Sequence, residues 1–92
     1  MIGAQERGEN HMSRDEVMER VADVIRDVFD DDQIQITDDT VAGDVEGWDS
    51  LMHITLIGTI EDEFDVKFAM KDVVGMKNVG QMVDLILELL DQ

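Results

Sequence analysis

The 92-residue chain contains no cysteine and no proline, and it has few aromatic and few basic side chains. Without cysteine, no disulfide and no cysteine-based zinc site can brace the fold, and no thiol of the protein can take part in covalent chemistry. This composition suits a reducing compartment, and we expect a cytoplasmic location. No apolar run approaches the length of a membrane span, so we expect no insertion into a membrane.

Basic residues are strongly outnumbered. The 7 Lys and Arg residues stand against 23 Asp and Glu residues, which gives a formal net charge of -16 at pH 7. This charge would repel a phosphate backbone and argues against nucleic-acid binding. It favours partners with basic docking patches, because attraction raises the encounter rate and orients the approach. The alternative is that the charge only keeps a small protein in solution.

The chain has the size of one small domain, and its 43% of hydrophobic residues is enough for a core. The first ten residues are polar and aperiodic, and His11-Met12 resembles a cloning junction before a clear helix start. We predict that residues 1–12 are a tag or a disordered leader and that residues 13–92 form the domain.

The first helix is predicted over residues 14–29. Ser13 and Glu16 fit a capping box at its start, and apolar residues three or four apart follow. A run of three aspartates from Asp30 opposes the helix dipole and should end the helix. A long loop follows, in which three apolar residues are expected to dip into the core: Ile34, Ile36 and Val41.

Three further helices are predicted over residues 50–64, 69–74 and 79–90, with Asp49 and Asn78 as N-caps of the two longer ones. In the helix over 50–64 the expected core-facing stripe is Leu51, Ile54, Ile57, Ile60 and Phe64. The predicted fold class is therefore all-α, a small four-helix bundle. It has three longer helices, one short helix and a long loop between the first two.

Carboxylates in this loop invite comparison with a calcium-binding loop. Counted from Asp38, a glycine falls at the sixth position, as such a loop requires. The fifth position is Ala42, which has no side-chain oxygen, and the twelfth is Asp49 instead of a bidentate glutamate. We therefore assign no metal ligands, although a calcium-responsive protein is kept as one alternative function.

Ser50 would be the first residue of the second helix, where unpaired amides and the positive end of the helix dipole favour a phosphate ester. The adjacent Asp49 carboxylate would repel that phosphate, so a partner enzyme with a metal ion is expected to manage the charges. The alternative is that Asp49-Ser50 is only a helix cap. His53 could contact Ser50, but no third residue is evident to orient it, so an exposed histidine is expected.

The motif Trp48-Asp49-Ser50-Leu51, followed by the helix end Ile60-Glu61-Asp62-Glu63-Phe64, resembles the acyl carrier protein family over about residues 13–90. The resemblance implies that Ser50 carries a covalent 4'-phosphopantetheine arm. It further implies that Asp49 assists the transferase and its metal, and that Leu51 is an apolar contact beside the arm. The missing cysteine fits this reading, because the reactive thiol would arrive with the prosthetic group.

The resemblance places partner docking on Met52, Thr55, Glu61 and Asp62. Met52 and Thr55 stand where carriers of fatty-acid synthases often have acids, which implies a specialised member with a dedicated partner. Trp48 replaces a residue that is often small, and its expected role is packing over the loop. Gly58, in mid-helix, would allow either the close approach of another helix or room for an acyl chain.

The implied function is that of a carrier that holds acyl intermediates as thioesters and presents them to partner enzymes, without catalysing a reaction itself. The implied partners are a phosphopantetheinyl transferase and acyl-transferring or synthase enzymes, and a monomer is expected. The alternative, from another functional class, is an acidic helical interaction module without a prosthetic group.

Overall fold

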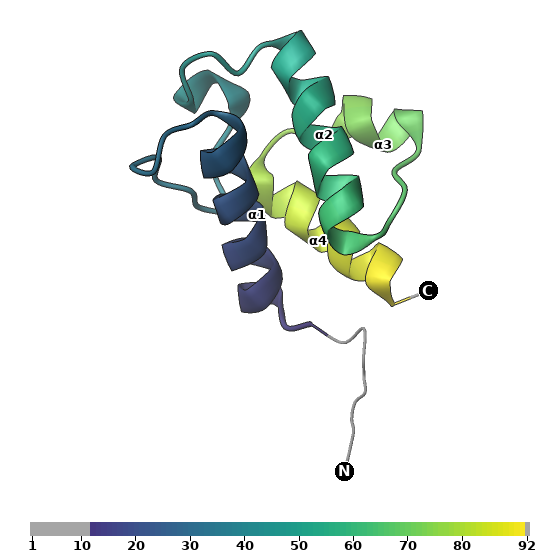
Figure 1. Cartoon of the computed structure of the whole chain (residues 1–92). Helices are drawn as coiled ribbons and strands as arrows, with labels where there is room; N and C mark the ends of the chain where they lie inside the picture. Colours follow the sequence, from purple (N-terminus) through teal and green to yellow (C-terminus); the bar gives the residue numbers. More distant parts are fainter. Residues whose placement is uncertain (1–11, 92) are drawn as a thin grey trace.

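Five helical segments follow one another along residues 12–91, the part of the chain that this computed structural model describes. They are α1 (Arg14–Val28), the 3-10 turn η1 (Ala42–Asp44), α2 (Ser50–Phe64), α3 (Met70–Gly75) and α4 (Val79–Leu90). The helix α1 packs against both α2 and α4, and a long loop leads from α1 to α2 (Figure 1). The predicted all-α bundle of three longer helices and one short helix is confirmed.

The predicted leader over residues 1–12 lies almost wholly outside the described residues, and the domain boundary stays a prediction. Met12 is described, and it packs partly buried against the core. The next residue, Ser13, starts α1 with the expected capping box: its Oγ accepts the Glu16 amide at 3.1 Å, and its own amide donates to Glu16 Oε1 at 3.0 Å. Asn78 caps α4 in the predicted place as well.

The capping box gives α1 a defined pH dependence. Hydrogen bonds from the backbone and then from the side chain of Ser13 lower the pKa of Glu16 below its ordinary value of 4.5. Because the folded-state pKa is the lower one, this stabilisation is present above the unfolded-state pKa and is lost as pH falls through the folded-state pKa. We expect the urea midpoint of wild type to approach that of Glu16→Gln between pH 6 and pH 3. A constant difference would contradict this.

The core lies where α1, α2 and α4 meet, and α1 and α4 present the expected apolar faces to it. Its buried side chains are Val17, Val21, Val24, Ile25, Leu56, Ile57, Ile60, Phe64, Val79, Met82, Val83 and Ile86. The predicted loop anchors Ile34 and Ile36 pack partly buried against this cluster, as expected.

The predicted core stripe of α2 is wrong at its first two members. Leu51 is 74% exposed and Ile54 is 59% exposed, whereas Leu56 is fully buried. The physical reason is helix geometry: three residues advance about 300° around the axis, so each step of three falls about 60° short of a full turn. A row built from such steps drifts around the helix. Leu51 and Ile54 therefore leave the face that Ile57 and Ile60 bury.

The prediction that Val41 is a third loop anchor is also wrong, since this residue is 39% exposed. The loop is instead held by its buried neighbour Thr40, whose Oγ1 accepts the Thr37 amide at 2.8 Å and whose carbonyl accepts the Val79 amide at 2.9 Å. The 3-10 turn that begins directly after Val41 was not predicted. Its amide hydrogen bonds fix the backbone there, and Val45, at the end of the turn, is buried in place of Val41.

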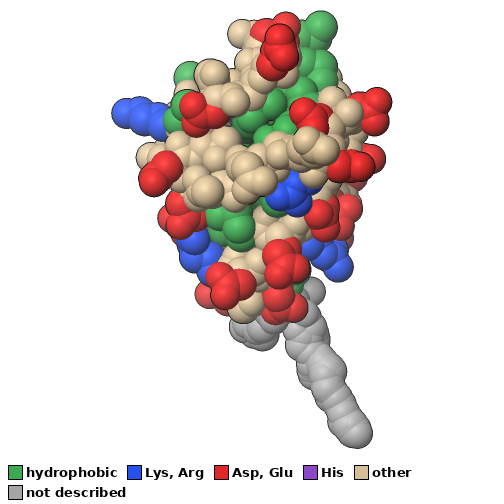
Figure 2. Space-filling view, turned by 90° about the vertical axis from the view of Figure 1, so that its left-hand side faces the viewer, with side chains coloured by type: hydrophobic (Ala, Val, Ile, Leu, Met, Phe, Trp, Pro, Cys, Tyr) green, Lys and Arg blue, Asp and Glu red, His purple; other side chains and the backbone are tan. Residues whose placement is uncertain are grey.

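Arg14 ties three distant parts of the chain together. Its guanidinium bonds Asp84 of α4 and Asp38 of the loop at 2.9 Å each, and these hydrogen bonds raise its pKa. Elsewhere acidic side chains are spread over the surface with few basic ones between them, as one face of the molecule illustrates (Figure 2). The negative charge of the chain is therefore distributed over its surface.

Candidate functional site

Ser50 is exposed at the first position of α2, and within residues 12–91 its hydroxyl makes no hydrogen bond. The turn before it requires a left-handed backbone at Gly47, where φ is 88°. Asp49 then caps the helix, its Oδ1 accepting the Met52 amide at 2.9 Å. The amides of Ser50 and Leu51 find no acceptor in the described chain, so they point unpaired from the positive end of the helix.

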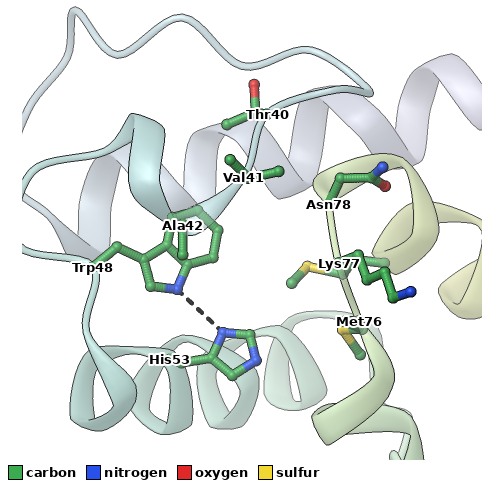
Figure 3. Close-up of a pocket in the computed structure, with 9 residues that line it drawn as sticks. Thr40, Val41, Ala42, Trp48, His53, Met76, Lys77 and Asn78 are labelled. Carbon is green, nitrogen blue, oxygen red and sulfur yellow. Dashed lines mark hydrogen bonds between the residues drawn. The ribbon is translucent and has the colours of Figure 1, made fainter.

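Trp48 is held on both sides. Its ring centroid lies 5.6 Å from that of Phe29, which caps the end of α1, and 6.1 Å from that of His53. Its indole Nε1 donates a hydrogen bond to His53 Nδ1 at 3.1 Å (Figure 3). Packing of Trp48 over the loop agrees with the expected role. The expected exposure of His53 is wrong, because this contact leaves its side chain half-buried.

A groove of about 500 Å³ lies beside Ser50, between α2 and α3. Its walls are largely apolar: Ala42, Trp48, Ile54, Met70, Val73, Val74 and Met76 line it, together with Asp49, Ser50 and His53. A smaller cavity of about 50 Å³ lies further in, towards Thr40, Asn78 and Met82. Ala42, Trp48, His53 and Met76 line both spaces. A group attached at Ser50 would therefore lie directly beside apolar surface.

The groove also depends on residues that the sequence did not point to. Met70 and Val74 of the six-residue helix α3 are 74% and 78% exposed, and they line the groove together with Ile54. The signal was present in the apolar spacing of residues 70, 73 and 74, which is helical although the helix is too short to bury a face. Gly58 has open space where a Cβ would be, which rules out close helix packing as the reason for that glycine.

The loop carboxylates do not converge on a metal site. Among residues 12–91, no group of three His, Cys, Asp or Glu side chains is arranged to hold an ion. Asp38 is bound to Arg14, and Asp49 caps α2. Asp44 Oδ2 accepts the Val41 amide at 3.0 Å across the 3-10 turn. These carboxylates are therefore engaged in folding the loop.

The four predicted docking residues lie at different places along α2. Met52 is half-buried and Thr55 is exposed, both close to Ser50 in the first two turns. Asp62 is exposed in the last turn. Glu61 is half-buried, and its Oε2 accepts the Phe68 amide at 2.9 Å, so it secures the connection from α2 to α3. Docking at these residues stays a prediction, and Glu61 has a structural role besides.

The comparisons with known proteins agree with this geometry. The family described as "Phosphopantetheine attachment site" matches residues 19–86. The mitochondrial acyl carrier protein of Saccharomyces cerevisiae is 35% identical over 81 residues, covering 83% of this chain and 64% of the yeast protein, just under two thirds of its length. The acyl carrier protein of Saccharopolyspora erythraea is 30% identical over 78 residues, covering 85% and 82% of the two chains.

A solved structure has the same fold. The solution structure of holo acyl carrier protein from Geobacter metallireducens superimposes with a TM-score of 0.77 at 39% identity, over 82% of this chain and 86% of that one. No helix among residues 12–91 is long and apolar enough to cross a membrane. Because one relative is mitochondrial, the cytoplasmic location stays a prediction. Together the family match, the relatives and the shared fold show that this chain belongs to the acyl carrier protein family, whose members carry 4'-phosphopantetheine and are carriers rather than catalysts.

Proposed function

We propose that Ser50 Oγ is the attachment point of the phosphopantetheine arm in this carrier. The observation that carries the proposal is an exposed hydroxyl without a hydrogen-bond partner in the described chain, set at a helix start beside two unpaired amides. Those amides and the helix dipole favour a phosphate ester there. The groove next to Ser50 adds an apolar surface for the attached group. When bound, the arm supplies the thiol that this chain lacks.

Two neighbours of Ser50 have distinct proposed roles. Asp49 uses Oδ1 to cap α2, and its Oδ2 makes no hydrogen bond in the described chain, so it can approach a metal ion brought by the transferase. Leu51 points its side chain outward, at 74% exposure, and offers apolar contact to the arm or to the enzyme that covers it. The negative charge of Asp49 requires that metal, because a bare carboxylate would repel the incoming phosphate.

The proposed partners are a phosphopantetheinyl transferase and enzymes that transfer or extend acyl groups, with the carrier acting as a monomer. Residues 50–60 contain no Asp, Glu, Lys or Arg, so docking next to Ser50 relies on contacts with uncharged residues such as Met52 and Thr55. Acids further along the chain, Asp62 among them, act from a greater distance and steer the encounter with a basic surface. This separation supports a dedicated partner.

Incubation with coenzyme A and a promiscuous phosphopantetheinyl transferase tests the proposal. The intact mass should rise by one arm, and peptide mapping should locate the arm on the peptide that contains Ser50. An unchanged mass would instead favour the acidic interaction module. A saturable calcium titration at micromolar concentration would favour the calcium-responsive alternative.

Placing a charge in the exposed apolar patch formed by Leu51 and Ile54 should weaken docking. The Ile54→Asp protein is expected to raise the transferase KM about tenfold or more with an unchanged kcat, because an exposed side chain contributes binding and not chemistry. Asp62→Asn is the comparison variant. It should also raise KM, and this increase should become smaller as the salt concentration rises. Equal KM values for Ile54→Asp and wild type would argue that the partner does not cover this patch.

A further inference from the structure

The Trp48–His53 contact fixes which nitrogen of His53 carries the proton. An indole N–H can only donate, so His53 Nδ1, 3.1 Å away, is the bare nitrogen of a neutral ring. The proton of that neutral ring is then on Nε2. The two rings are stacked, with an interplanar angle of 25°, and this packing maintains the orientation.

The Nε2–H group lies on the side of the His53 ring that faces Met76. Figure 3 shows the second nitrogen of His53 on the side of Met76, turned away from Trp48. His53 and Met76 both line the groove and the inner cavity. This N–H makes no hydrogen bond to residues 12–91, and a half-buried donor without a partner gains from an acceptor that enters.

We propose that His53 is a positioning residue for the carried group: its Nε2–H donates a hydrogen bond to a carbonyl oxygen of the group attached at Ser50. This rests on the proposed function. A carbonyl is a neutral acceptor and suits a neutral donor in an apolar groove. A carboxylate would be repelled by Asp49 at the groove mouth, and the cation that lines the inner cavity, Lys77, does not line the groove. The carbonyl can belong to an amide of the arm or to the thioester of the cargo.

Nuclear magnetic resonance of the imidazole nitrogens distinguishes these sources. The ¹⁵N-labelled protein is compared in three forms: unmodified, carrying the arm with a free thiol, and carrying an acetyl thioester. In the unmodified protein we expect Nδ1 to be bare and Nε2 to be protonated. Exchange of the Nε2 proton should slow about tenfold on loading. Slowing in the free-thiol form identifies an arm amide, and slowing in the acetyl form alone identifies the thioester.

Two results would overturn the proposal. One is an Nε2–H signal that exchanges equally fast in all three forms, as expected if the ring pair only braces the loop. The other is a proton on Nδ1 in the unmodified protein. Failure of the attachment itself is separate, because it appears as an unchanged intact mass before any spectrum is compared.

Variants give an independent readout through contacts between the carried group and the Met76 methyl, measured as nuclear Overhauser effects. His53→Phe keeps a ring but loses both nitrogens, and it should weaken these contacts at least threefold. His53→Gln keeps a carbonyl for Trp48 and an N–H for the carried group, and it should restore them. Thr59→Ala, further along α2 and outside the groove, is the matched control. Unchanged contacts in His53→Phe, with a native backbone spectrum, would refute the positioning role.

Discussion

The Ser50→Ala protein is expected to keep its original mass after incubation with coenzyme A and a phosphopantetheinyl transferase, while wild type gains one arm. The loss should be complete, because the ester needs the hydroxyl oxygen and no other group at this helix start can replace it. The fold should be retained. Ser50 is exposed, its hydroxyl bonds nothing in the described chain, and alanine is a good helix former.

The chain supplies its own control for this experiment. Its second serine, Ser13, also stands at the start of a helix, but its hydroxyl is engaged by the Glu16 amide in the capping box. Ser13→Ala should lose about 1 kcal/mol of stability with its cap and still take up the arm at the wild-type rate. Two outcomes would refute the assignment of the attachment site: a mass increase in Ser50→Ala, or an unchanged mass in Ser13→Ala.

Truncating Ile60 should produce the largest loss of stability among the changes considered. Its side chain is fully buried between the helices, and removing such a side chain costs about 2–5 kcal/mol. A domain of this length has about 5–14 kcal/mol in total, so Ile60→Ala should remove a large part of it. Urea unfolding followed by circular dichroism at 222 nm measures the change, with the slope of the transition checked for constancy.

Ile54→Ala is the matched comparison, since it makes the same substitution six residues earlier on the same helix. Because 59% of the Ile54 surface is exposed, Ile54→Ala should lower the free energy of unfolding by about 0.5 kcal/mol or less. Equal losses for the two variants would contradict the described packing of α2 and would revive the predicted stripe that includes Leu51 and Ile54. Ile54 therefore matters little for stability in this structure, which is consistent with its proposed role in docking.

The parts of the fold that the sequence predicted well are those decided within one turn of helix. The caps at Ser13, Asp49 and Asn78 join residues three apart, and the structure forms each of them. The order of three longer helices and one short helix follows from these starts and from apolar spacing. The errors at Leu51 and Ile54 arose because a row of apolar residues three apart drifts around the helix. The error at Val41, and the choice of which apolar residues of α2 are covered, have another origin. Which side of an element is buried depends on the neighbour that covers it, and apolar identity does not specify that neighbour.

The candidate site divides in the same way. Asp49-Ser50-Leu51 could be found in the sequence because the helix start, the cap and the serine are adjacent in the chain. The groove could not, since its walls come from the loop, α2, α3 and the segment that leads into α4. The role of His53 was missed for a related reason. Their spacing on one helix allows a contact between His53 and Ser50, but the bond to Trp48 depends on how the turn through Gly47 brings the indole back over α2.

By itself, the sequence determined the charge, the absence of a thiol, the helix starts and the serine at the first position of α2. These properties are composition or hydrogen bonds between near neighbours, so they need no knowledge of the packed state. The tertiary structure alone decided which face of α2 is buried, which nitrogen of His53 receives the hydrogen bond of the indole, and that Ser50 opens onto an apolar groove. Those features depend on side chains brought together from distant segments, whose positions are fixed only when α1, α2 and α4 pack into one core.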